Sequence, residues 1–341
     1  MPVRAGTRRR AVDPIPRERN PEVKLRRTLS AAVAGALLAA ALIAPATSGA
    51  FVVGVGDQSS GLFSNEHYLR LNAKRTRLIV PFNAALRKDD RAWVDDWMAA
   101  ARAARQEVVV AFNPPWTMKC PNLNGAKGCR PVSSAQYTRA FKAFRKRYPQ
   151  VKIYQPWNEV NNLTQPTAHR PDAVVTYYRI VRKNCRGCKV LGADIQDLPN
   201  MVNYTRKLLA TFKKRRIATP KLWGMHNYTD VNRFVKDKNS SMRKIVKLLP
   251  GKIWLTETGG IYRFQPQNAR QTFRPDLKRQ AKAIDALFKQ ASTYRRKIDR
   301  VYLYNWFAAP ADNRWDSGFV DAAGKPRPAY KRLLRFKKHI R

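Results

Sequence analysis

Eight short apolar runs follow one another along the chain after residue 50, and segments of helical character lie between most of them. The runs do not alternate apolar and polar residues, which is typical of strands buried on both faces. They lie at residues 51–56, 76–82, 107–112, 151–157, 189–194, 221–228, 252–257 and 300–306. Strands joined through helices pair in parallel by right-handed crossovers, and eight is the number that closes a (β/α)8 barrel.

The segments between these runs carry apolar residues at helical spacing. Helices are predicted at residues 89–105, 133–148, 171–184, 199–216, 239–249, 275–297 and 327–340, with a weaker one at 65–73. Several begin with Asp, Ser or Pro, the residues that cap or start a first turn. Barrels of about 250 residues commonly form one domain. We therefore predict an α/β fold, a single (β/α)8 TIM barrel domain at residues 51–341.

The first fifty residues have the composition of a targeting segment. Leu29–Ala44 is mostly apolar, follows a basic stretch, and precedes small residues that end at Ala50. It is shorter than the roughly twenty residues that cross a membrane. We therefore predict a signal peptide with an extended basic n-region at residues 1–50, cleaved after Ala50. The product is expected to be secreted, without a membrane span; an uncleaved anchor is the alternative.

The chain is strongly basic, with 67 Lys and Arg against 23 Asp and Glu and a formal charge of +44. Residues 1–50 hold nine of these bases and three of the acids, so residues 51–341 keep a charge of +38. Such a charge favours anionic partners, among them cell-wall polymers and acidic polysaccharides. No nucleic-acid-binding motif appears, so we expect no specific nucleic-acid partner. Retention on an anionic cell wall and a simply solvated basic surface both remain open, and we expect a monomer.

Four cysteines lie in the expected barrel, Cys120, Cys129, Cys185 and Cys188. An even number in an exported chain favours disulfides. Proximity in the sequence favours Cys120–Cys129 and Cys185–Cys188 among the three possible connectivities. A zinc site is the alternative, because Cys185 and Cys188 have the spacing of metal ligands.

Two glutamates lie where expected strands end. Glu159 follows the fourth run, in "QPWNEV", and Glu257 ends the seventh, in "WLTETGG". Catalytic groups of parallel barrels gather at the C-terminal ends of the strands. The fourth and seventh strands face each other across the barrel mouth, so the two carboxylates can flank a bound ligand. Cleavage of a glycosidic bond needs such a pair.

With Asn158 and Glu159 after the fourth strand and Glu257 on the seventh, the chain resembles the glycoside hydrolases of clan A, which include families five and thirty-nine. The resemblance implies a (β/α)8 barrel that hydrolyses glycosidic bonds of a polysaccharide or oligosaccharide, usually β-linked, with retention of configuration. It implies that Glu159 is the acid/base and Glu257 the nucleophile. No cofactor or metal is implied.

Other residues of the chain match the same pattern. By the resemblance, Arg77 of the second strand braces the nucleophile, and His226 and Tyr228 of the sixth lie near both carboxylates. Trp306, after the eighth, would form the floor under a sugar. Asn158 would hydrogen-bond a sugar 2-hydroxyl, a contact that strengthens in the transition state. An adjacent Arg77 cation and Tyr228 hydroxyl would favour the ionised form of Glu257.

Two positions depart from the clan pattern. Val160 stands where many members carry proline, which makes the loop after Glu159 uncertain, and Asn113 stands where several families place histidine. Because a fold does not by itself imply a function, a second hypothesis is a catalytically silent glycan-binding or cell-wall-associated protein on the same barrel. The presence of both glutamates favours the enzyme.

Overall fold

A computed structural model of the chain describes residues 51–116, 118, 129–266 and 272–340. One parallel sheet contains β1 (Val52–Gly56), β2 (Arg75–Pro81), β3 (Glu107–Asn113), β4 (Ile153–Gln155), β5 (Lys189–Val190), β6 (Asp194–Gln196), β7 (Leu222–His226), β8 (Lys252–Thr258) and β10 (Ile298–Tyr304). Their spatial order is β5-β4-β3-β2-β1-β10-β8-β7-β6. Each predicted strand is present, and the fifth is divided between β5 and β6.

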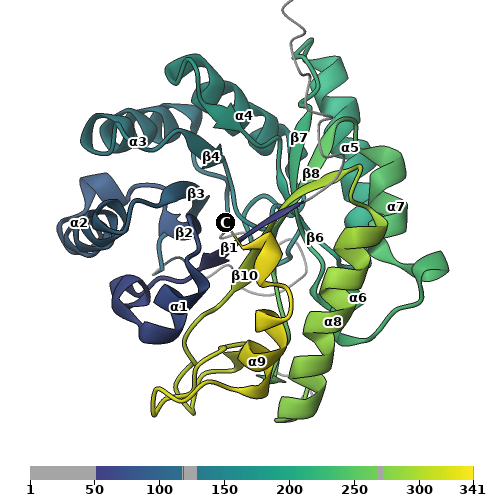
Figure 1. The fold of residues 1–341 in the computed structure, drawn as a ribbon. Helices are drawn as coiled ribbons and strands as arrows, with labels where there is room; N and C mark the ends of the chain where they lie inside the picture. Colours follow the sequence, from purple (N-terminus) through teal and green to yellow (C-terminus); the bar gives the residue numbers. More distant parts are fainter. Residues whose placement is uncertain (1–50, 117, 119–128, 267–271, 341) are drawn as a thin grey trace, which may run out of the picture. The chain divides into compact units, whose positions relative to one another are not determined.

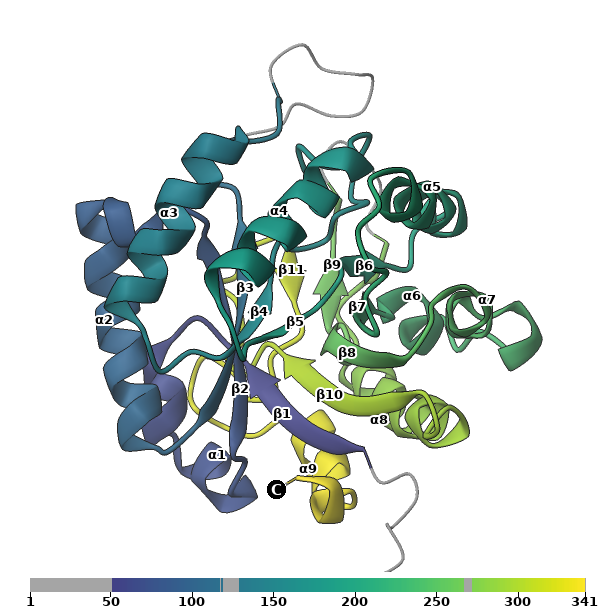
Figure 2. The ribbon, with the colours of Figure 1, turned by 90° about the horizontal axis from the view of Figure 1, so that it is seen from above.

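This division closes the sheet. β5 pairs with β4 and β6 pairs with β7, so the run from Lys189 to Gln196 joins the two ends of the sheet. Within it, the Leu191 amide donates to the Tyr154 carbonyl at 3.0 Å, and the Gly192 amide donates to the Leu222 carbonyl at 2.8 Å. A Cβ on Gly192 would lie 2.6 Å from a Pro220 side-chain carbon, so a glycine is required there. The sheet is thus a closed parallel barrel, as Figures 1 and 2 show.

Helices surround the strands on the outside (Figure 1). They are α1 (Glu66–Leu71), α2 (Lys88–Ala103), α3 (Ser134–Arg147), α4 (Pro171–Asn184), α5 (Met201–Lys214), α6 (Tyr228–Asn232), α7 (Ser241–Leu248), α8 (Leu277–Thr293) and α9 (Pro328–Leu334). Their starts follow the expected capping chemistry. Ser133 forms a capping box with Gln136 at the start of α3, and the Ser240 hydroxyl accepts from the Arg243 amide at 3.0 Å at the start of α7.

The described residues also contain four 3-10 helices and two short strands outside the barrel. Single-turn 3-10 helices lie at Ser60–Ser64, Ala84–Leu86, Asp237–Asn239 and Lys337–His339, and the short strands β9 (Arg263–Phe264) and β11 (Trp315–Asp316) pair antiparallel. The helix predicted at residues 327–340 is shorter in the structure: α9 ends at Leu334, and a 3-10 helix follows at Lys337–His339. β4 also ends earlier than predicted, because Pro156 has no amide hydrogen to continue the ladder.

The strands are buried on both faces, as their apolar runs predict. Val109, Ile153, Leu191, Trp254 and Tyr302 form one separate cluster of buried side chains. Their neighbours in sequence, for example Val110 and Leu255, belong to the larger cluster that includes the helices. Because successive side chains of a strand point to opposite faces, the smaller cluster fills the barrel interior and the larger one packs the strands against the helices.

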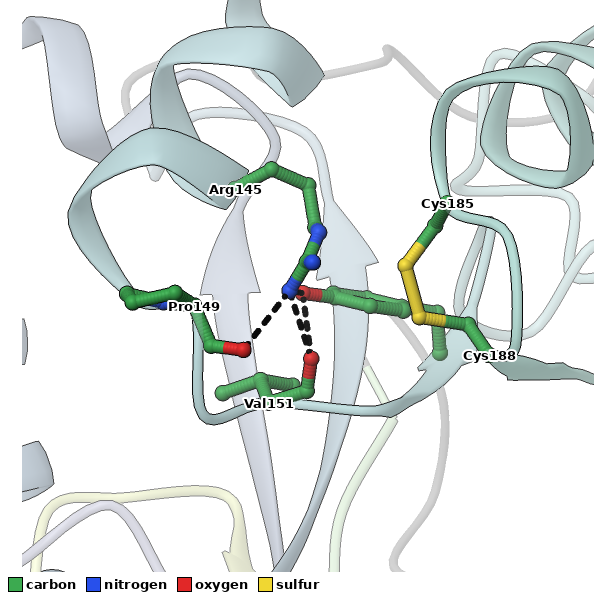
Figure 3. The surroundings of a disulfide bond; sticks show 6 residues. Arg145, Pro149, Val151, Cys185 and Cys188 are labelled. Atoms are coloured by element: carbon green, nitrogen blue, oxygen red, sulfur yellow. Dashed lines mark hydrogen bonds between the residues drawn. A yellow bond between two sulfur atoms is a disulfide. The ribbon is translucent and has the colours of Figure 1, made fainter. Parts of the chain in front are cut away.

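A disulfide joins Cys185 and Cys188, which lie between α4 and β5 with their Cα atoms 5.5 Å apart (Figure 3). Arg145 of α3 lies beside it and donates to the carbonyl oxygens of Pro149 and Val151, at 3.1 and 2.8 Å. The predicted Cys185–Cys188 pair is confirmed, and these two sulfurs are not zinc-binding thiolates here. The other predicted pair includes Cys120, which lies outside the described residues.

The predicted signal peptide, residues 1–50, also lies outside the described residues. None of the helices at residues 51–116, 129–266 and 272–340 is long and apolar enough to cross a membrane.

Candidate active site

The predicted site residues come from strands that end at one face of the barrel. Arg77 is in β2, His226 ends β7, Glu257 lies in β8 one residue before its end, and Glu159 follows β4. Since all these strands are parallel, their C-terminal ends lie together. Hydrogen bonds connect these four side chains and that of Asp194 into one cluster of five, which we call the carboxylate cluster: Arg77, Glu159, Asp194, His226 and Glu257.

Arg77 is the centre of this cluster. Its guanidinium donates to Glu257 Oε2 at 2.8 Å, to Asp194 Oδ2 at 2.8 Å and to Asn158 Oδ1 at 2.6 Å. A fourth bond, from Nε to Gln155 Oε1, is 2.6 Å long. Burial alone would lower the pKa of Arg77, but the carboxylates of Asp194 and Glu257 raise it. Arg77 therefore stays charged and holds the nucleophile candidate Glu257 in place.

Asp194 was not selected from the sequence. It is fully buried, and its Oδ2 accepts from both Arg77 and His226 while Oδ1 accepts from the Thr256 hydroxyl. Burial raises the pKa of a carboxyl group, but the His226 and Arg77 cations lower the pKa of Asp194 below its usual value. Asp194 ends the fifth expected strand, so the strand-end criterion that selected the two glutamates applies to it as well.

His226 connects two carboxylates. Nδ1 lies 3.1 Å from Glu159 Oε1, and Nε2 lies 3.0 Å from Asp194 Oδ2. Burial alone would lower the pKa of His226, but the carboxylates of Asp194 and Glu257 raise it to about 10. The ring is therefore an imidazolium at neutral pH, with both N–H groups donating to carboxylates.

Glu257 has partners on both of its oxygens. Oε2 accepts from Arg77, and Oε1 accepts from the Tyr228 hydroxyl at 3.3 Å. Its side chain is 8% exposed. Burial raises the pKa of Glu257 above its ordinary value, and the His226 and Arg77 cations oppose that rise. The predicted positions of Arg77, His226 and Tyr228 around Glu257 thus agree with the structure.

Glu159 is the more open of the two glutamates, with 17% of its side chain exposed. Its Oε1 faces His226, and its Oε2 accepts from Asn162 Nδ2 at 3.0 Å. The same Asn162 amide donates to Gln196 Oε1 at 3.0 Å. The backbone of Glu159 is left-handed, with φ of 45°. Residues held in such a conformation are uncommon outside glycine and gather at functional sites.

Val160 explains how the loop after Glu159 is held without the clan's proline. The Val160 amide donates to the Asp194 carbonyl at 2.9 Å, a bond that proline cannot make. The Val160 side chain is buried in the core. This chain therefore ties the acid/base candidate to β6 through a main-chain hydrogen bond.

Trp306 is not part of the cluster, and its predicted role as the floor under a sugar is corrected. It is 0% exposed. Its indole packs on Tyr68 and Phe319, with ring centroids at 5.6 and 5.8 Å, and donates to Asn65 Oδ1 at 3.0 Å. A fully buried ring has no face to offer a ligand.

Trp315 lies next to Tyr228, which contacts the cluster through Glu257. It is partly buried and packs edge-on against Tyr228 at 4.8 Å between centroids, one residue away from Glu257. The strand-end criterion could not select it, because it lies in β11, eleven residues after the last barrel strand ends at Tyr304.

The cluster also contains a set of atoms suited to a metal ion. One ligand atom from each of Glu159, His226 and Glu257 lies within 4.8 Å of the others. A metal ligand must be a neutral imidazole, whereas both nitrogens of His226 face carboxylates and Arg77 already neutralises Glu257. The Arg77 and His226 cations therefore already balance the carboxylates that would bind a metal.

Comparisons with known proteins connect the barrel to one group of enzymes by fold. No family model matches the sequence, and no curated protein matches it. Among solved structures, a novel GH10 endoxylanase retrieved from a sugarcane soil metagenome has a TM-score of 0.58 at 15% identity, over 84% of this chain and 97% of that one. An endo-1,4-beta-xylanase from Caldicellulosiruptor owensensis has a TM-score of 0.56 at 16% identity, over 84% and 97%.

A third similar structure is the intracellular xylanase TsXylA from Thermoanaerobacterium saccharolyticum, as a mutant in complex with xylotriose. Its TM-score is 0.55 at 15% identity, over 83% of this chain and 95% of that one. At these identities the comparisons establish a shared fold, the α/β barrel of xylanases. The chemistry of this chain has to be argued from its own site.

Proposed function

We propose that the protein is a retaining glycoside hydrolase in which Glu257 is the nucleophile and Glu159 the acid/base. One observation carries the proposal: an oxygen of Glu159 and an oxygen of Glu257 lie within 4.8 Å of each other. Retaining enzymes hold their two carboxyl groups about 5–5.5 Å apart, whereas inverting enzymes need about 6.5–9.5 Å for an intervening water.

The environments of the two glutamates suit these different roles. Glu257 lies against the Arg77 cation and the Tyr228 hydroxyl, both of which favour the carboxylate that attacks the anomeric carbon. Glu159 is more exposed and so can exchange protons with water between the two steps. It protonates the leaving oxygen as the Glu257–sugar bond forms, and then takes a proton from the water that breaks this bond.

The substrate class is a polysaccharide or oligosaccharide with β-linked sugars. The shared fold with proteins named as xylanases, one an endo-1,4-beta-xylanase and another bound to xylotriose, supports this class. Asn158 Oδ1 accepts from Arg77, so the side-chain NH2 group of Asn158 is the part that would reach a sugar 2-hydroxyl. We assign Trp315 to the border of the bound sugar because its ring packs on Tyr228, which donates to Glu257.

The proposal includes export from the cell. Its support is the apolar segment Leu29–Ala44 and the small residues up to Ala50. The disulfide Cys185–Cys188 also fits an oxidising compartment.

The test measures release of reducing sugar from neutral and acidic polysaccharides, with xylan among them. Glu257→Ala is expected to lose essentially all activity, and azide should restore part of the activity on an activated aryl glycoside because it replaces the missing nucleophile. Unchanged activity in this variant would rule out the proposed nucleophile. Binding of a polymer without any release of reducing ends would instead support the silent glycan-binding protein.

A further inference from the structure

The outer surface of the barrel has a groove between α3 and α4, which lie side by side in Figure 1. It consists of two adjoining hollows. The hollow farther from the C-terminal ends of the strands, which we call the lower hollow, has a volume of about 440 Å³. The residues that line it include Ser134, Thr138, Lys142, Thr176, Arg179 and Lys183. The upper one, of about 590 Å³, includes Arg130 and Arg170. Ser134 and Thr176 line both hollows, so the two form one continuous α3–α4 groove.

The lower hollow holds positive charge without a counter-ion. Lys142, Arg179 and Lys183 are exposed, and among the described residues none of them has a carboxylate within 4.0 Å. None of the described residues that line this hollow is acidic. Arg179 and Lys183 are four residues apart on one helix face, where like charges destabilise the helix. An anion bound between α3 and α4 would remove this repulsion.

The upper hollow differs because it contains one acid, Asp172. Arg170 contacts this carboxylate at 3.0 Å and Arg215 contacts it at 3.8 Å. Asp172 is therefore already paired and does not offset the charge of the lower hollow. Arg130 adds a further exposed cation at the upper end.

The neutral residues of the groove indicate which kind of anion fits. Ser134, Thr138 and Asn184 have hydroxyl and amide oxygens that can accept from sugar hydroxyls. None of the described residues lining the lower hollow is aromatic, whereas proteins that bind single-stranded nucleic acid stack its bases on aromatic rings. From Ser134 to Lys142 the hollow follows α3 for about 12 Å, at 1.5 Å per residue. The groove is long enough for more than one sugar.

We propose that the α3–α4 groove binds a carboxylate-bearing polysaccharide, with uronate groups on Lys142, Arg179 and Lys183. α3 and α4 follow β3 and β4, so the upper end of the groove lies at the face where those strands end, the face of the carboxylate cluster. A chain held in the groove lies on the flank of the barrel and leaves the cluster free. The inference does not depend on the proposed hydrolysis, because binding can be measured without catalysis.

The experiment compares two triple variants of the full-length protein that change the net charge equally. The groove variant is Lys142→Glu, Arg179→Glu and Lys183→Glu. The control variant is Lys214→Glu, Lys244→Glu and Lys247→Glu, three exposed bases of α5 and α7. Both carry Glu257→Ala, so that no polymer is cut. Binding of polygalacturonate, inorganic polyphosphate and a neutral β-glucan is measured at about 0.1 M salt, where charges farther apart than about 10 Å are screened.

The groove variant should bind polygalacturonate at least about tenfold more weakly, and the control variant no more than about twofold more weakly, since distant charge is screened. Equal losses in both variants would show that overall charge alone binds the polymer and would overturn the proposal. It would also be overturned if the parent protein failed to bind polygalacturonate, or bound polyphosphate as tightly through the same three residues. Should charge reversal unfold the groove variant, the three residues are changed to Gln instead and the same comparison applies.

Discussion

Asp194 and His226 are joined by a 3.0 Å contact between Oδ2 and Nε2, and both side chains are fully buried. The same Asp194 oxygen accepts from Arg77, which in turn holds Glu257. His226 reaches Glu159 through its other nitrogen. One aspartate therefore orients the partners of both catalytic candidates without lying between them.

Asp194→Asn should impair catalysis through position and charge. The variant keeps the shape of the side chain but removes the carboxylate that holds His226 protonated, so the pKa of His226 should fall. We expect kcat/KM to decrease roughly 10²-fold, as for other small displacements of catalytic groups. The pH profile of kcat/KM distinguishes this effect from a purely structural defect. Because the pKa of His226 falls, the basic limb of the profile should move to lower pH. Asp172→Asn, which removes a partly exposed acid of α4, is the control and should change neither quantity.

Arg77→Met should destabilise the protein as well as inactivate it. Removal of the guanidinium leaves Asp194 and Glu257 buried beside His226 alone, and breaking a buried ion pair costs about 3–5 kcal/mol. Arg77→Lys keeps the positive charge, but its ammonium has only three N–H donors for the four acceptors of Arg77. It should therefore recover only part of the stability. Urea unfolding measures the loss of stability in each of the two variants. A loss of less than about 1 kcal/mol in Arg77→Met, the range of exposed ion pairs, would contradict a structural role for this charge.

The structure explains which parts of the fold and site were predictable. The barrel followed from eight apolar runs, because parallel strands buried on both faces leave that pattern. Glu257 and His226 were predictable because strand ends converge in any parallel barrel. The short element α6 was not foreseen, since Tyr228 was placed at the end of a strand and instead begins a helix that lies after β7.

The errors concern side chains whose position depends on tertiary packing. Trp306 lies two residues beyond the end of β10, where Tyr68, Phe319 and Asn65 Oδ1 hold its ring in the core. None of these partners is near it in sequence. The left-handed backbone of Glu159 is equally invisible in the sequence, because the amides on either side of it, of Asn158 and Val160, donate to carbonyls of other strands.

Stability should depend on pH through His226. Its pKa is about 10 in the folded protein and 6.5 without perturbation, so the folded state binds the proton more tightly. The stabilisation is fully present below about pH 6.5 and is lost as the pH rises through about 10. The free energy of unfolding should therefore fall by a few kcal/mol between pH 6.5 and 10. Urea unfolding of the parent protein and of His226→Gln between pH 6.5 and 10 measures this dependence. In His226→Gln the fall in the free energy of unfolding that comes from His226 should be absent.

Activity should depend on pH through Glu257. Because burial raises the pKa of Glu257, a larger share of this carboxyl is protonated in mildly acidic solution than for an ordinary glutamate. The acid limb of kcat/KM should therefore lie above the ordinary value of 4.5, and activity should be lost as the pH falls through it. A limb at or below that value would show that the Arg77 and His226 cations outweigh burial.

Val160→Pro tests whether the main-chain bond to Asp194 fixes the acid/base. The substitution removes the amide that donates to the Asp194 carbonyl, and an unpaired buried carbonyl costs about 1–3 kcal/mol. It also presses the preceding residue toward extended backbone, whereas Glu159 has φ of 45°. We expect lower stability and a roughly 10²-fold loss of kcat/KM from the displaced Glu159. Val160→Ala keeps the amide and loses only packing, so it should lower stability with little effect on kcat/KM. If Val160→Pro retains full activity, the loop can adopt the proline geometry of the clan, and the Val160–Asp194 bond does not position Glu159.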